Sequence, residues 1–99
     1  MNIVENNIDR IKKLCDKYHV LKLYIFGSVL NSQFSNESDI DFLVTFANVE
    51  LTEYADNYFD FKFSLEDLFQ RQIDLLEEKA IKNPFFKQSV ENSKKLIYG

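Results

Sequence analysis

The sequence predicts an α/β fold, with one small mixed sheet of about three strands flanked by helices. Segments with apolar residues at helical spacing alternate with short, apolar, β-leaning segments, which is the pattern of such folds. A length of 99 residues fits a single domain over 1–99, and 45% apolar residues is a globular value. Two Gly and one Pro are too few for a turn-rich all-β fold or for a linker. The expected element order is α-β-(short α)-β-α-β-α.

The first half of the chain is expected to form a helix and two strands. Residues 3–18 place apolar side chains three and four positions apart, which predicts an amphipathic helix. Residues 21–26 are apolar and rich in β-forming side chains, which predicts a strand. A short helical turn over 28–31 and a polar loop over 31–38 then lead to a second strand over 39–46.

The second half is expected to add a long helix, a strand and a final helix. Apolar residues at steps of three and four predict the long helix over 51–70. A third strand is predicted over 72–77. Asn83 is a typical helix cap and Pro84 a typical first helical residue, so the final helix should begin there and run to about Lys95.

The composition excludes several classes of protein. Sixteen acidic against twelve basic residues give a net charge of −4, which argues against direct nucleic-acid binding. One Cys and one His exclude an internal disulfide framework and a two-histidine zinc motif. No apolar run is long enough for a membrane span, so a cytoplasmic protein without a membrane partner is expected. Ten Phe exceed what a small core needs, and candidates for an exposed partner surface are Phe59, Phe63, Phe85 and Phe86.

Charge is distributed unevenly along the chain. No Lys, Arg or His lies between Lys22 and Lys62. The same stretch contains seven acidic residues: Glu37, Asp39, Asp41, Glu50, Glu53, Asp56 and Asp60. A stretch of this sign attracts cations and repels phosphates unless a metal ion intervenes.

Two short motifs in this stretch indicate chemistry on phosphates. Gly27-Ser28 follows the first strand. Gly27 has no side chain, so its backbone can approach a phosphate closely, and Ser28 adds a hydroxyl and an N–H that can bind the phosphate. Ten residues later come Asp39 and Asp41, whose side chains share one strand face and repel each other. Mg²⁺ is the cation best suited to neutralise the two carboxylates, because it takes oxygen ligands and keeps coordination positions for substrate phosphates. The two motifs in this order predict phosphoryl or nucleotidyl transfer.

Asp74 is the third candidate carboxylate. If its strand lies beside the Asp39 strand, the three carboxylates meet, and Asp74 could ligate the metal and accept the proton of an attacking hydroxyl. The alternative is an exposed strand carboxylate without a role, and the spacing alone leaves both interpretations open.

These motifs together resemble the minimal nucleotidyltransferase (MNT) family of the DNA polymerase β-like nucleotidyltransferase superfamily. The resemblance implies the polymerase β-like fold and the transfer of NMP, typically AMP from ATP, to a hydroxyl. It further implies that Gly27 and Ser28 hold the triphosphate, and that Asp39 and Asp41 bind two Mg²⁺ ions. Asp74 would bind the catalytic metal and serve as the base. Many family members are encoded beside a HEPN-domain ribonuclease toxin and act as its antitoxin, so the implied partner is such a toxin and the implied acceptor is one of its tyrosines.

The chain departs from the family pattern at one position. Many members have Arg where this sequence has Asn31, which can hydrogen-bond to a phosphate but cannot neutralise it. Mg²⁺, Arg71, the lysines near the end of the chain or a partner must then supply the positive charge at the triphosphate, and Arg71 is the first candidate. The alternative function is a catalytically weak or inactive binding module that neutralises its partner by contact. The sequence leaves the choice of nucleotide and the oligomeric state open, a homo-oligomer included.

Overall fold

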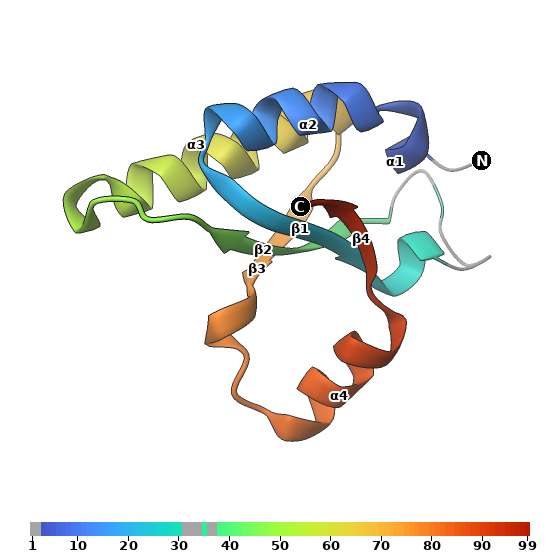
Figure 1. Ribbon diagram of the computed structural model, residues 1–99. Coiled ribbons are helices and arrows are strands. Elements are labelled where there is room, and N and C mark those ends of the chain that lie inside the picture. The colour runs from blue at the N-terminus through green and yellow to red at the C-terminus, as the bar shows by residue number, and fades with distance from the viewer. Residues whose placement is uncertain (1–2, 31–34, 36–37) are drawn as a thin grey trace.

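The computed structural model describes residues 3–30, 35 and 38–99, and it confirms the α/β class (Figure 1). The elements in chain order are α1 (Ile3–Asn6), α2 (Ile8–Lys17), β1 (Val20–Phe26), the 3-10 turn η1 (Gly27–Leu30), β2 (Ile40–Phe46), α3 (Leu51–Phe69), β3 (Ile73–Glu77), the 3-10 turn η2 (Glu78–Ala80), α4 (Pro84–Ser93) and β4 (Lys95–Tyr98). The strands form one mixed sheet in the order β3-β2-β1-β4. β1 is antiparallel to both β2 and β4, whereas β2 and β3 are parallel.

Helices cover both faces of the sheet. α2 and α3 lie on one face and α4 lies on the other (Figure 1). The main core lies under α2 and α3, and its fully buried members include Ile11, Leu23, Ile25, Ile40, Phe42, Phe61 and Leu65. A smaller cluster on the opposite face joins Phe26, Leu43 and Val90. Alternation along β2 therefore divides its side chains between the two layers, because successive residues of a strand point to opposite faces.

The helix predicted over 3–18 is interrupted at Asn7. Its side-chain Nδ2 donates a hydrogen bond to the Ile3 carbonyl at 2.9 Å, and its backbone N–H bonds to the Val4 carbonyl at 3.1 Å. Asn side chains compete for backbone partners in this way and so favour helix ends over helix interiors. The apolar periodicity is still correct, because Val4, Ile11 and Cys15 are all buried.

α3 confirms the predicted long helix and ends one residue earlier than expected. Gln70 follows it with a left-handed φ of 53°, which stops the helix. The four aromatic side chains predicted to be exposed are exposed: Phe59 by 47%, Phe63 by 56%, Phe85 by 83% and Phe86 by 41%. Neither α3, at 19 residues, nor any other helix in the described ranges is long and apolar enough to cross a membrane.

The end of the chain differs from the prediction. α4 begins as expected, since Asn83 Oδ1 accepts hydrogen bonds from the N–H groups of Phe85 and Phe86 at 2.9 and 3.1 Å. It ends at Ser93, however, and residues 95–98 form β4, so the sheet has four strands and not three. Four residues are too few to show a strand pattern. Their conformation depends on pairing with β1, with Tyr98 opposite Leu23.

Candidate active site

Two carboxylates meet where β2 and β3 run side by side. Asp41 of β2 lies directly opposite Asp74 of β3 in the parallel pair. Both side chains are on the α4 face of the sheet, because Leu43 and Leu76, two positions further along each strand, pack into the cluster on that face. The second and third predicted strands are therefore neighbours, which was the condition for the three carboxylates to meet.

The environment of Asp41 disfavours its charged form. Burial is the largest cause, followed by a side-chain hydrogen bond with Asp74 and by the charges of Asp74 and Asp39, and together they raise the pKa of Asp41 from 3.8 to about 6. Asp39 stands just before β2 and is exposed, as is Asp74. Protonation of Asp41 below about pH 6 relieves its repulsion with Asp74, and a bound cation would relieve the repulsion at higher pH.

Gly27, the first residue of η1, brings the backbone after β1 against this pair. Its φ is +77°, in the left-handed region that favours glycine. A Cβ atom built on Gly27 would lie 2.3 Å from Oδ2 of Asp41, which is closer than any real contact. Only glycine therefore allows the Asp41 carboxylate to keep its place. The predicted phosphate-binding residue Gly27 and the predicted metal ligand Asp41 are thus brought into direct contact.

The turn after Gly27 is the 3-10 turn η1, which Val29 fixes to the core with 4% of its surface exposed. The Ser28 side chain and the whole of Asn31 lie outside the described part of the chain. Their expected contacts with a nucleotide therefore stay predictions.

Arg71 joins β3 to the segment that precedes Asp39. Its Nη1 donates hydrogen bonds to the carbonyls of Ser35 and Ser38, both at 3.0 Å. The same two serines form a turn, in which the Ser38 N–H bonds to the Ser35 carbonyl at 3.2 Å. The guanidinium thus contacts the backbone beside Asp39, and no feature of the sequence predicted this contact.

The donor set fits a magnesium ion. Asp39, Asp41 and Asp74 offer only carboxylate oxygens, and Mg²⁺ commonly takes one or two protein carboxylates together with waters and phosphate oxygens. Among the described residues, no three His, Cys, Asp or Glu side chains are arranged to enclose a metal by themselves. Asp41 and Asp74 would accordingly hold the ion, with Asp39 next to them, and a nucleotide would supply the other ligands.

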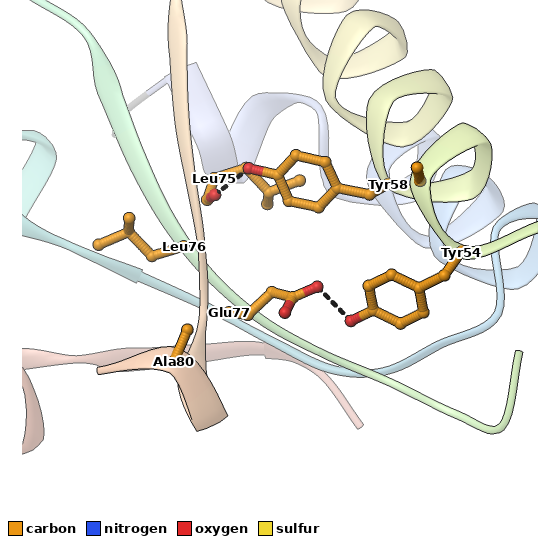
Figure 2. A pocket seen from close by; sticks show the side chains of 7 residues that line it. Tyr54, Tyr58, Leu75, Leu76, Glu77 and Ala80 are labelled. Carbon is orange, nitrogen blue, oxygen red and sulfur yellow. Dashed lines mark hydrogen bonds between the residues drawn. The ribbon is translucent and has the colours of Figure 1, made fainter. Parts of the chain in front are cut away.

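A groove that the sequence did not predict follows the outer edge of β3. It consists of two cavities of about 390 and 410 Å³ that share Leu76, Glu77 and Ala80, and we call them together the β3 groove. The first cavity is completed by Tyr54, Ala55, Tyr58 and Leu75, and the second by Ile81, Lys82, Asn83 and Phe86. Figure 2 shows how the α3 tyrosines border it: the Tyr54 hydroxyl bonds to Glu77, and the Tyr58 hydroxyl donates to the Leu75 carbonyl at 2.5 Å. Burial, and then the bond to Glu77, raise the pKa of Tyr54, so its phenol stays protonated.

Comparisons with known proteins bear on the family and the fold of the chain. Residues 9–99 match the family described as "Polymerase beta, Nucleotidyltransferase". A candidate protein adenylyltransferase of Methanocaldococcus jannaschii, MJ0128, is 40% identical over 87 residues, which cover 88% of this chain and 84% of that protein. The crystal structure of a toxin–antitoxin with AMP-PNP has a TM-score of 0.72 at 22% identity, covering 94% of this chain and 73% of that chain. The structure of a tri-AMPylated HEPN toxin of Shewanella oneidensis in complex with an MNT antitoxin has a TM-score of 0.66 at 21% identity, covering 98% of this chain and 73% of that chain. At these identities the two structures show a shared fold.

Proposed function

The chain belongs to the polymerase beta nucleotidyltransferase family, and from this premise we propose that it transfers AMP from ATP to a hydroxyl group of a partner protein. The observation that supports this most is the alignment of Asp41 with Asp74 beside the backbone of Gly27. It combines a carboxylate pair, whose repulsion a bound cation would relieve, with a glycine backbone that lies directly against it.

In the proposed reaction, the acceptor oxygen forms a bond to the α-phosphorus of ATP while the bond between the α-phosphorus and the pyrophosphate oxygen breaks. Asp74 accepts the hydroxyl proton, for which it is suited because it is exposed and its neighbour Asp41 is the more strongly desolvated carboxylate. Two bound Mg²⁺ ions would stabilise the charge that develops on the phosphates. Gly27 and Ser28 would hold the triphosphate, and Asn31 would add a neutral hydrogen bond.

The partner we propose is a HEPN-domain toxin, with this chain as its antitoxin and a toxin tyrosine as the acceptor. Support comes from the fold shared with a toxin–antitoxin bound to AMP-PNP and with an MNT antitoxin in complex with a HEPN toxin. We expect the reaction in the cytoplasm. The oligomeric state stays open.

One observation favours a second candidate, inhibition of the toxin by contact alone. The guanidinium of Arg71 bonds to two backbone carbonyls and position 31 is Asn, so the positive charge that would clamp the triphosphate is weaker here than in many family members. Contact inhibition requires neither the carboxylates nor a nucleotide.

The experiment that tests the proposal uses the purified chain, a purified HEPN-domain toxin, Mg²⁺ and each of the four ribonucleoside triphosphates in turn. Intact-mass spectrometry should show the toxin gaining AMP in the presence of ATP. The gain should disappear with a chelator and in the Asp39→Asn, Asp41→Asn double variant. An unmodified toxin that is nevertheless inhibited by the wild-type chain would favour contact inhibition.

A further inference from the structure

The direction from which the acceptor must approach follows from the order of the strands. Gly27 directly follows β1, Asp41 lies on β2 and Asp74 lies on β3, and these strands are neighbours in the sheet. In an in-line displacement, the attacking oxygen and the leaving pyrophosphate lie on opposite sides of the α-phosphorus. If Gly27 holds the pyrophosphate end, as the proposed function requires, the acceptor hydroxyl arrives from the side of β3.

The β3 groove lies on that side. Leu76, which lines both of its cavities, is two residues beyond Asp74 on the same strand face, about 6.6 Å along the strand. A side chain seated over Leu76 would therefore lie within a residue or two of a hydroxyl held by Asp74. The groove continues around the edge of β3 to Tyr54 and Tyr58, which gives room for the residues that flank the hydroxyl.

The chemistry of the lining indicates what the groove would bind. Leu76, Ala80 and Ile81 form an apolar floor, and Phe86, which is 41% exposed, forms a wall whose ring meets Phe26 edge-on at 6.2 Å between centroids. Such a surface takes an aliphatic or aromatic side chain. Lys82 borders the same cavity and is exposed, so an acidic residue of the bound segment would find a partner there.

We propose that the β3 groove binds the acceptor segment of the partner protein, with an apolar or aromatic side chain beside the modified hydroxyl and an acidic residue facing Lys82. This inference rests on the proposed function and adds to it the surface that selects the acceptor. The in-line geometry constrains only the attacking oxygen and the leaving pyrophosphate. It does not determine where the nucleobase lies, because the ribose that carries the nucleobase is attached to the phosphorus by a bond that does not break. The nucleobase is therefore the rival occupant.

The test fills the groove without touching the carboxylates. Ala80 is exposed and borders both cavities, so Ala80→Trp should obstruct the whole groove. Ala47 is exposed and borders neither cavity, which makes Ala47→Trp the matched control. Lys82→Glu, with the exposed α4 residue Lys87→Glu as its control, tests the charge and serves as the second variant if Ala80→Trp misfolds. The probe is the HEPN-domain toxin with Mg²⁺–ATP, and initial rates of AMP transfer are measured against both concentrations.

The expected result for Ala80→Trp and Lys82→Glu is a KM for the toxin raised about 10-fold or more, with the KM for ATP within about twofold of wild type. Both controls should behave as wild type. A raised KM for ATP with an unchanged KM for the toxin would assign the groove to the nucleobase and overturn the inference, and so would wild-type kinetics in both variants. A wild-type chain that transfers nothing would instead refute the proposed function, and the acceptor site with it.

Discussion

Replacing Asp41 with Asn should stabilise the metal-free protein and abolish its response to metal. The wild-type carboxyl binds a proton more tightly in the folded chain than in the unfolded chain, because its pKa is raised to about 6. For such a group the folding stability falls as the pH rises, here between about pH 4 and pH 6, and stays lowered above that range. Asn removes the titrating charge and keeps a polar group that can donate to Asp74.

The size of the effect follows from the pKa. The difference between 3.8 and about 6 corresponds to roughly 3 kcal/mol at about 1.4 kcal/mol per pH unit. Asp41 is only partly buried, so screening by solvent reduces this, and we expect about 1–2 kcal/mol at pH 8. For a domain of this size that is a rise in Tm on the order of 5–10 °C.

The assay is thermal unfolding followed by circular dichroism at pH 4.5 and pH 8, in a chelator and again with Mg²⁺ and ATP. In the chelator, the Tm of Asp41→Asn should be higher than that of wild type at pH 8, and this difference in Tm should be much smaller at pH 4.5. Mg²⁺ with ATP should raise the Tm of wild type alone. Asp60→Asn, which removes an exposed charge from α3, controls for the net charge. The reasoning is refuted if Asp41→Asn is less stable than wild type at pH 8 without metal, or no more stable than Asp60→Asn.

Three other substitutions test the rest of the site. Gly27→Ala should lower the free energy of unfolding by about 1–2 kcal/mol, because alanine disfavours the positive φ at this position. It should also weaken Mg²⁺–ATP binding at least tenfold, because the new Cβ displaces the Asp41 carboxylate. A wild-type affinity measured by calorimetry would contradict this. Arg71→Ala should raise the Mg²⁺ concentration needed for half-maximal transfer, with partial rescue by Arg71→Lys, because the side chain supports the segment before Asp39; a rise confined to the KM for ATP would point to a phosphate contact. Asp74→Asn should slow AMP transfer by about 10²–10⁴-fold while toxin binding persists, and a mutant that still protects cells from the toxin would establish inhibition by contact.

The elements marked by local signals were predicted to within a few residues. Asn83 and Pro84 specify the start of α4 by their own chemistry, and the alternation along β2 specifies which side chains enter the core. β4 has no such signal, because its four residues become a strand only by pairing with β1. The interruption at Asn7 depends on the hydrogen bond from its side chain to the Ile3 carbonyl, and the spacing of apolar residues cannot predict such a bond.

The candidate site divides in the same way. The motif made Asp39 and Asp41 candidates from the sequence alone. The position of Asp74 opposite Asp41 depends on β3 lying beside β2, which could be stated from the sequence only as a condition. The partners of Arg71 are backbone carbonyls 33 and 36 residues away, and no residue type marks them in advance. The β3 groove is formed by segments of α3, β3, η2 and α4, so it exists only once these elements have packed together.

The parallel pairing of β2 and β3 also bears on how fast the chain can fold. Parallel neighbours cannot be joined by a tight turn, and here the whole of α3 forms the crossover, so Asp41 and Asp74 meet across a long loop closure. Non-local pairings of this kind slow folding. Without a cation, the repulsion between the two carboxylates opposes this pairing, and it does so most strongly above the pKa of Asp41. A divalent ion bound at the proposed site would screen the pair and lower this barrier, so we expect refolding to be faster with Mg²⁺ than in a chelator.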